Sequence, residues 1–216
     1  FDHGELRIGN RIVLREHFRC MPEIIRFSND LCYRNTPLIP LRQYPPQRLE
    51  PLIANHVENG FREGDGSRAV NRPEAERLVD AIAQCCSDPR YGVNGRRPTL
   101  GVISLQGWTQ AEYIEHLLLQ RLGAEEMAQR RLLCGDAYSF QGDERDLIFL
   151  SLVAAPNMRI GALTKFADQQ RFNVAASRAR DQLWLFHSVM PGDLSENCMR
   201  RQLLEHFLDP TRTARH

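Results

Sequence analysis

Residues 141 to 144, Gln-Gly-Asp-Glu, place polar groups and a flexible backbone directly before a run of apolar residues. Gln141 offers both a donor and an acceptor, and the Glu144 carboxylate can accept hydrogen bonds from hydroxyl groups such as those of a ribose. Gly142 lets the backbone approach a ligand closely. A solvated turn is the alternative, and we favour it for the three charged neighbours that can pair among themselves, Asp143, Arg145 and Asp146. For Gln141 and Glu144 the spacing leaves both interpretations open.

Two arginines in the segment "QRFNVAASRARDQLWLF" are spaced for joint contact with an anion. On a helix, Arg171 and Arg178 lie seven residues apart and project on a shared side, about 10 Å from each other. No acidic residue lies between them, and the planar guanidinium group suits bidentate contact with phosphate. The alternative is that Arg178 pairs with Asp181, three residues further on.

Phe18 and Arg19 form a third candidate pair, next to the predicted start of a helix. A ring beside a guanidinium group can hold a nucleotide base and its phosphates together. The alternative places Phe18 in the core and Arg19 at the surface, with its apolar stem against the protein.

The segment "SLQGWTQ" joins a predicted strand to a predicted helix, so free N–H groups and the positive helix end favour phosphate there. Neutral donors and one stacking ring accompany it: Ser104, Gln106, Gln110 and Trp108. Such a set suits a nucleic-acid backbone held irrespective of sequence. An ordinary capped helix with a partly buried Trp108 is the alternative.

The elements that must position these residues alternate between apolar runs and amphipathic helices. Strands are expected in "LIANHVEN", "TLGVISLQ", "RRLLCG", "DLIFLSLV" and "DQLWLFHSV". Helices are expected over about 22 to 33, over "NRPEAERLVDAIAQCC" with Asn71 as cap and Glu74 at the capping-box position, over "GWTQAEYIEHLLLQRLG", and over about 196 to 208. Strands that are apolar on both faces and separated by helices predict a three-layer α/β/α sandwich with a mostly parallel sheet.

In an open parallel sheet, ligands bind beyond the carboxyl ends of the strands. We therefore expect the loop after "RRLLCG", which contains Gln141 and Glu144, to lie at that edge.

Length and composition limit the kinds of protein that this chain can be. The 216 residues suit one domain, and the chain begins at Phe1 without a leader, so we expect a fragment of a longer, cytoplasmic protein. No apolar run approaches the ~20 residues that span a membrane. The six cysteines show no CxxC pair, so we expect reduced thiols and no metal site.

Missing motifs argue against two classes of enzyme. The basic residues are 27 arginines and one lysine, Lys165, and no Gly-Lys dipeptide occurs, which excludes a self-sufficient P-loop NTPase. The absence of GxGxxG and of a nucleophile elbow disfavours a small-molecule enzyme.

Taken in order, the segments resemble the second RecA-like domain of superfamily 1 helicases, in the branch of the nonsense-mediated mRNA decay helicase. "LREHFRCMPEIIRFSNDLCY" resembles the family's L-x-x-x-Y-R-M-H-P stretch and the helix after it, and "NRPEAERLVDAI" resembles its N-x-x-E-A helix. "GVISLQGWTQ" is similar to the family's strand and glutamine-ended loop, "YSFQGDERDLIFLSLV" to motif V and "RFNVAASRARDQLWLF" to motif VI. The match covers roughly residues 11 to 190 of a single 1–216 domain.

The resemblance implies an ATP and Mg²⁺ site shared with an N-terminal RecA-like domain whose Walker motifs are absent here. It implies that Phe18 stacks on adenine, that Arg19 and Arg178 contact the γ-phosphate, and that Gln141, Gly142 and Glu144 sense the nucleotide. From its spacing to Arg178, we expect Arg171 to contact the cofactor as well. Single-stranded DNA or RNA would contact Ser104, Gln106, Trp108, Gln110 and Ser139.

The sequence departs from the family pattern at two places. Cys20 and Met21 replace the family's Met-His, and Asp136 to Ser139 replace the Thr/Ser-Val-Asp before motif V. We therefore expect the C-terminal RecA-like domain of an ATP-dependent helicase, inactive as an isolated fragment. A nucleic-acid-binding or regulatory module without catalysis is the alternative.

Overall fold

A computed structural model describes residues 15–43, 49–92 and 96–210. Its centre is a five-stranded sheet in the order β3-β9-β8-β6-β7, with every neighbouring pair parallel. The strands are β3 (Leu52–His56), β6 (Leu100–Ser104), β7 (Leu133–Asp136), β8 (Arg145–Ser151) and β9 (Ala179–His187). All five apolar runs therefore form strands, as predicted.

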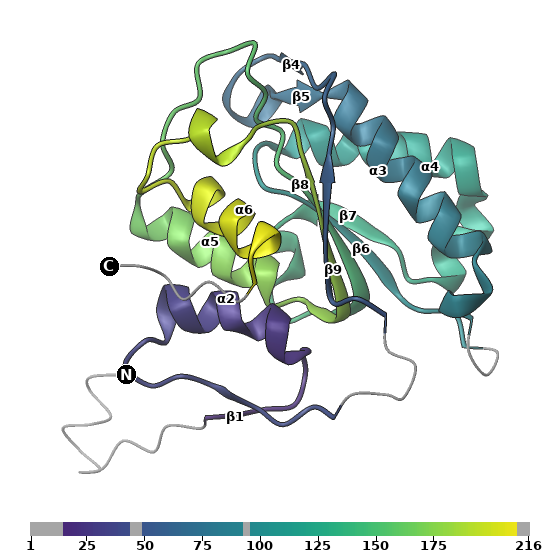
Figure 1. Ribbon diagram of the computed structural model, residues 1–216. Coiled ribbons are helices and arrows are strands. Elements are labelled where there is room, and N and C mark those ends of the chain that lie inside the picture. The colour runs from purple at the N-terminus through teal and green to yellow at the C-terminus, as the bar shows by residue number, and fades with distance from the viewer. Residues whose placement is uncertain (1–14, 44–48, 93–95, 211–216) are drawn as a thin grey trace, which may run out of the picture.

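Helices cover both faces of the sheet (Figure 1). The helices are α2 (Pro22–Cys32), α3 (Arg72–Ser87), α4 (Trp108–Gln129), α5 (Phe166–Ala176) and α6 (Met199–Leu208). The first core cluster joins α2, α5 and α6 to one face through side chains such as Ile148 and Leu150, and the second joins α3 and α4 to the other through Leu147 and Phe149. The predicted three-layer α/β/α sandwich is confirmed.

All seven residues of β8 are buried, which explains why its sequence shows no alternation. β8 lies between β6 and β9, so helices cover its two faces and strands its two edges. The residues that adjoin either end of β8 are therefore held by a strand that is enclosed on all sides.

Two helices differ from their predicted form. Asn71 caps α3 by accepting a hydrogen bond from the Glu74 N–H at 3.2 Å, but the Glu74 side chain turns toward the sheet and does not complete a capping box. α4 continues past its predicted end after a kink at Gly123. Its second part, residues 124–129, was not predicted.

Several short elements were also not predicted. They are the parallel pair β1 (Glu16–His17) and β2 (Ile39–Pro40), the antiparallel pair β4 (Arg62–Glu63) and β5 (Val70–Asn71), and the 3-10 turns η1 (Gly66–Arg68), η2 (Pro89–Tyr91), η4 (Tyr138–Phe140) and η5 (Pro191–Asp193). The β4–β5 pair lies directly before α3. With two residues per strand, these elements are too short to give a periodic signal.

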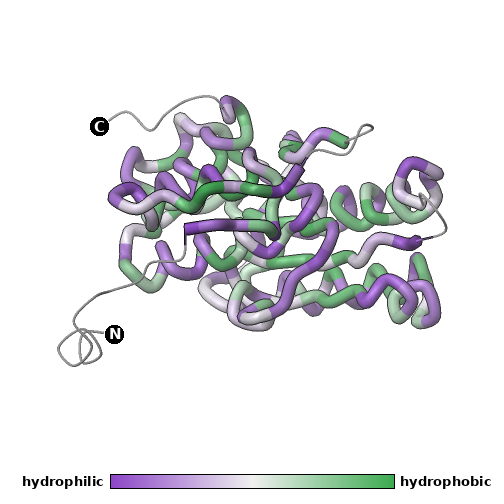
Figure 2. Tube along the Cα trace, turned by 90° about the horizontal axis from the view of Figure 1, so that it is seen from below, coloured by the Kyte–Doolittle hydropathy of each residue, from purple (hydrophilic) through white to green (hydrophobic). Residues whose placement is uncertain are grey.

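The motif V loop, residues 141–144, does not lie at the carboxyl edge of the sheet, where we expected it. Gln141 to Glu144 precede β8, so they lie at the amino edge of the sheet, opposite the carboxyl ends where they were expected. Figure 2 looks onto this amino edge and shows hydrophilic stretches there beside the apolar interior. The carboxyl edge holds the residues after β6 and β7, including Trp108 and Ser139.

Candidate functional site

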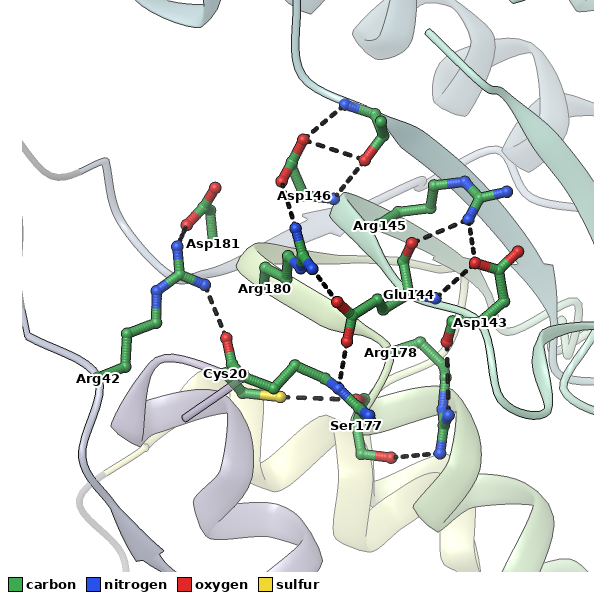
Figure 3. A network of polar contacts seen from close by, with 12 residues as sticks. Cys20, Arg42, Asp143, Glu144, Arg145, Asp146, Ser177, Arg178, Arg180 and Asp181 are labelled. Atoms are coloured by element: carbon green, nitrogen blue, oxygen red, sulfur yellow. Dashed lines mark hydrogen bonds and ion pairs between the residues drawn. The ribbon is translucent and has the colours of Figure 1, made fainter. Parts of the chain in front are cut away.

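Three distant segments meet at the amino edge of the sheet (Figure 3). They are the residues before α2, before β8 and before β9. Backbone hydrogen bonds join them: Met21 N donates to Arg180 O at 3.1 Å, and Arg145 N donates to Arg178 O at 3.0 Å. The candidate residues Arg19, Glu144 and Arg178 are thus brought together by the sheet and not by a single motif.

Glu144 pairs with two arginines. Its Oε2 contacts Nε of Arg19, and its Oε1 contacts Nη2 of Arg180. Glu144 therefore has specific partners, and the interpretation of a merely solvated carboxylate does not hold. Arg180 was not a predicted site residue.

Arg178 carries a charge that no carboxylate neutralises within the described part of the chain. Its Nε donates to Val174 O at 3.2 Å, its Nη1 to Asp143 O at 3.4 Å, and its Nη2 to Ser177 Oγ at 3.3 Å. Burial, followed by the charge of Arg19, lowers the pKa of Arg178. A guanidinium group held against carbonyls and beside a second guanidinium group favours an anionic ligand.

The geometry predicted for Arg171 and Arg178 is wrong. α5 ends at Ala176, so Arg178 follows the helix and Ala179 begins β9. Arg171 lies on α5, pairs with Asp168 at 2.9 Å, and is close enough to Arg200 on α6 to lower its pKa, after the larger effect of burial. The structure does not bring Arg171 to the amino-edge site.

The alternative partner of Arg178 is also wrong, because Asp181 pairs with Arg42. Arg42 additionally donates from Nη1 to the carbonyl oxygen of Arg19 at 2.7 Å, which fixes the backbone at Arg19. Burial raises the pKa of Asp181, while the positive charge of Arg42 opposes that shift. Sequence reasoning missed Arg42, since nothing near it in the chain signals a contact with residues 19 and 181.

Of the other three charged residues around the motif V loop, Asp143 and Arg145 pair with each other and Asp146 does not pair with them. Arg145 donates to Asp143 at 2.5 Å, as predicted, and its hydrogen bond is the first cause that lowers the pKa of Asp143. Asp146 differs: it is buried and accepts from Thr99 N at 2.8 Å and Thr99 Oγ1 at 3.0 Å. Asp146 is therefore an internal anchor and not part of a solvated turn.

Phe18 is 66% exposed, so it is not a core residue. It lines two adjoining hollows of about 400 Å³ and about 390 Å³, both of which also include Arg19. The first contains Arg178 and the second contains Glu144. Gln141 and Gly142 are exposed but line neither hollow, and Gly142 adopts φ +83°, which favours glycine.

Two of the predicted nucleic-acid contacts are wrong because their side chains are buried. Ser104 is 1% exposed and its Oγ donates to the backbone of Gln106 at 3.0 Å. Gln110 is fully buried, and its Nε2 donates to Asn71 O at 3.1 Å and to Ser151 Oγ at 3.0 Å. Both residues hold the carboxyl edge together and cannot reach a strand of nucleic acid.

Three other predicted contacts lie near the surface of the carboxyl edge. Trp108 is 45% exposed, and Ser139 is exposed while its N–H and Oγ–H both donate to Asp136 Oδ1 at 3.0 Å. The Gln106 side chain accepts a hydrogen bond from Arg200 of α6. Trp108 thus remains available at this edge, whereas Ser139 is bonded to Asp136 and Gln106 to Arg200 of α6.

Glu74 forms a buried cluster at the same edge that sequence reasoning did not assign to a site. Its Oε1 accepts from Ser151 Oγ at 2.6 Å and Val153 N at 2.8 Å, and its Oε2 accepts from Ser188 Oγ at 3.0 Å. Desolvation raises the pKa of Glu74 to about 7, against the opposing effect of these hydrogen bonds. The only signal in the sequence was its position in the N-x-x-E-A pattern.

Residues 15–43, 49–92 and 96–210 contain no group of three or more His, Cys, Asp or Glu side chains arranged to hold a metal ion. The six cysteines are free thiols, four of them buried. Among the helices of these same ranges, none combines the length and apolar character that crossing a membrane requires.

Comparison with known proteins places the chain in a family. A family model described as "AAA domain" matches residues 5–189. The chain is 27% identical over 211 residues to "Uncharacterized ATP-dependent helicase MG140 homolog" of Mycoplasma pneumoniae and 26% identical to "Uncharacterized ATP-dependent helicase MG140" of Mycoplasma genitalium. Each alignment includes 91% of this chain, which spans only 18% of either relative.

Among solved structures, the C-terminal domain of a possible DNA helicase from Lactobacillus plantarum WCFS1 aligns with a TM-score of 0.47 and 15% identity. That alignment covers 85% of this chain and 96% of the other. Since the family model matches most of the residues, this chain belongs to the AAA domain family, and its predicted resemblance to ATP-dependent helicases is confirmed.

Proposed function

We propose that this chain is the C-terminal RecA-like domain of an ATP-dependent helicase of superfamily 1, in the branch of the nonsense-mediated decay helicase. The observation that supports it most is the meeting of Arg19 and Arg178 at the amino edge. Arg178 has no carboxylate partner within the described residues, and Arg19 lies in the same hollow. Such a pair can stabilise the charge on a phosphoryl group in transfer.

In this proposal ATP and Mg²⁺ bind in a cleft between this domain and an N-terminal RecA-like domain. The exposed ring of Phe18 stacks on adenine, Arg19 and Arg178 contact the γ-phosphate, and Gln141, Gly142 and Glu144 respond to the nucleotide. The nearby carboxylates Asp143, Glu144 and Asp146 are paired with arginines, so the ligands of Mg²⁺ come from the N-terminal domain. We do not include Arg171, which lies elsewhere on α5.

Single-stranded DNA or RNA would bind at the opposite, carboxyl edge. Trp108 offers a stacking surface at the start of α4. Ser139 can donate to the strand only if its hydroxyl group gives up its hydrogen bond to Asp136. Gln106 contributes only where it can exchange its contact with Arg200. Closure of the two domains on ATP, and opening after hydrolysis, would then move the strand along both.

The test is Arg178→Ala in the full-length cytoplasmic protein. Loss of an arginine finger is expected to lower ATP turnover by ~10³-fold or more. Because Arg178 lies at the amino edge, the affinity for a fluorescent single-stranded oligonucleotide is expected to change less than about twofold, since no phosphate contact is removed. Steady-state phosphate release and fluorescence anisotropy measure the two quantities.

Arg201→Ala is the matched control, because Arg201 is partly exposed and pairs with Glu205 on α6, away from the site. It should leave ATP turnover unchanged. If Arg178→Ala also retains full turnover, or if the wild-type protein binds single strands without hydrolysing ATP, the chain is a non-catalytic nucleic-acid-binding module.

A further inference from the structure

Glu144 lies between two guanidinium groups at the amino-edge site (Figure 3). Arg19 contacts one of its carboxylate oxygens and Arg180 the other. The side chains of Arg19, Glu144 and Arg180 are 36%, 27% and 40% exposed. This three-residue arrangement, the Glu144 bridge, is therefore accessible to a ligand that enters the site.

The surroundings of the Glu144 bridge carry more positive than negative charge. The hollow of about 390 Å³ is lined by four arginines and three carboxylates: Arg19, Arg42, Arg96, Arg180, Glu144, Asp146 and Asp181. Arg178 adds a fifth guanidinium group from the adjoining hollow. The excess of two positive charges can be compensated by one phosphate group.

The two arginines of the bridge are held differently. Among the described residues, the Arg19 side chain has Glu144 as its partner, and only its backbone is fixed, by Arg42. Arg180 also faces a second carboxylate, since its Nη1 lies 3.9 Å from Asp146 Oδ1. Asp146 is itself buried and bound to Thr99. Arg180 is thus the anchored half of the bridge, and Arg19 is the half that can leave.

We propose that Glu144 is a resting counterion, which Arg19 exchanges for the terminal phosphate of ATP, and that Arg180 is a positioning residue that retains Glu144 during the exchange. This inference rests on the proposed function. Partly exposed ion pairs are weak, whereas a phosphate dianion offers a guanidinium group two charged oxygens, so the exchange favours the phosphate. Without Arg180, the Glu144 carboxylate would turn wholly to Arg19 and compete more strongly.

The experiment compares dissociation constants for ADP and for a non-hydrolysable ATP analogue in the full-length protein. The readout is the ratio of the ADP constant to the analogue constant, because a lost ribose contact would affect both nucleotides equally. Glu144→Gln removes the competing charge and should raise the ratio about 2- to 5-fold. Arg180→Ala should lower it by a similar factor, with unchanged ADP affinity as the evidence that the site is intact.

The double variant decides how Arg180 acts. If Arg180 works only through Glu144, the Glu144→Gln/Arg180→Ala protein should show the same ratio as Glu144→Gln alone. Arg72→Ala is the control, because Arg72 pairs with Glu63 at a remote, exposed position. An unchanged ratio in Glu144→Gln, or an Arg180→Ala effect that persists in the double variant, overturns the inference alone. A wild-type protein that binds neither nucleotide overturns the proposed function as well.

Discussion

At the scale of single residues, the arginines of the amino-edge site differ in the partners that their guanidinium groups contact. Arg145 is buried and bonded to Asp143, to Glu144 O and to Arg131 O. Arg42 divides its donors between Arg19 O and Asp181. These two arginines hold the structure, whereas Arg178 keeps its charge without a carboxylate among the described residues. Arg178 therefore differs from these two structural arginines in that its charge has no carboxylate partner in the described part of the chain, which suits it to an external anion.

The buried Glu74 predicts a pH dependence of stability. Its folded-state pKa of about 7 lies above the ~4.3 of an unfolded chain, so the folded protein retains a proton that the unfolded chain releases. The free energy of unfolding should therefore decrease as pH rises from about 4.3 through 7. In Glu74→Gln this decrease should be absent, a difference of about 1 to 3 kcal/mol between the two proteins over that interval.

Urea unfolding of both proteins at about pH 5 and about pH 8 measures this difference. Glu63→Gln is the matched control, because Glu63 is exposed on β4 and should leave the pH profile unchanged. Parallel profiles for the wild type and Glu74→Gln would show that Glu74 is ionised in the folded protein at both pH values.

The sequence alone predicted only some of the residues that lie at the two edges of the sheet. Phe18, Arg19, Glu144 and Arg178 could be predicted because a family pattern surrounds each of them. Ser104 and Gln110 were misplaced because the burial of a polar side chain depends on partners far along the chain. For Gln110 these are Asn71 and Ser151, which satisfy its amide in the interior. Arg180 belongs to the site only because β9 and β8 lie side by side.

At the scale of elements, the junctions between strands and helices determine which side chains reach an edge. Gly107 joins β6 to α4 with φ +84°, and a Cβ atom there would lie 2.7 Å from Ser67 O. Ser67 belongs to η1, so this junction also packs against the β4–β5 region. The position of Trp108 at the carboxyl edge depends on this close approach.

Gly107→Ala is therefore expected to destabilise the protein through both backbone strain and a steric clash. Gly123→Ala is the matched control, because Gly123 has φ +80° but nothing within 4 Å of an added Cβ. Strain alone should cost about 1 kcal/mol at Gly123, and the clash should raise the cost at Gly107 to about 2 to 4 kcal/mol. Chemical denaturation of the two variants compares these costs, and equal losses would contradict the role of the Ser67 contact.

The strands and longer helices could be predicted because their apolar runs and caps are local signals. The end of α5 could not. Ala-Ala-Ser-Arg-Ala-Arg has good local helix propensity, but Ser177 leaves the helix and Ala179 pairs with Arg145 in the sheet. Sheet pairing outweighs local preference there, and it moves Arg178 from a helix face to the amino edge.

At the scale of the whole molecule, the two predicted functions lie on opposite edges of one sheet. The residues proposed to contact nucleotide precede α2, β8 and β9 at the amino edge, and the residues proposed to contact nucleic acid follow β6 and β7 at the carboxyl edge (Figure 1). Phosphate-binding backbone and lysine groups of a P-loop are not present on either edge, because the sequence has no Gly-Lys pair. The proposed ATP hydrolysis thus requires residues from outside this chain.

The purified 216-residue chain is accordingly expected to bind nucleotide weakly and to hydrolyse no ATP above background. Phosphate release with and without single-stranded oligonucleotide measures this, and the full-length protein is the positive control. Turnover by the isolated chain, retained in its Arg178→Ala variant, would point to contamination, and turnover abolished by that substitution would contradict the proposed division of the site.

β8 joins these edges directly. It begins beside Glu144, ends at Ser151 against Glu74, and its seven buried residues span about 20 Å. A strand enclosed on all sides has a fixed length, so events at one edge cannot shorten or stretch the path to the other. Distances between labels at the two edges of this domain should therefore stay constant through the proposed ATP cycle, while distances to the proposed N-terminal domain change.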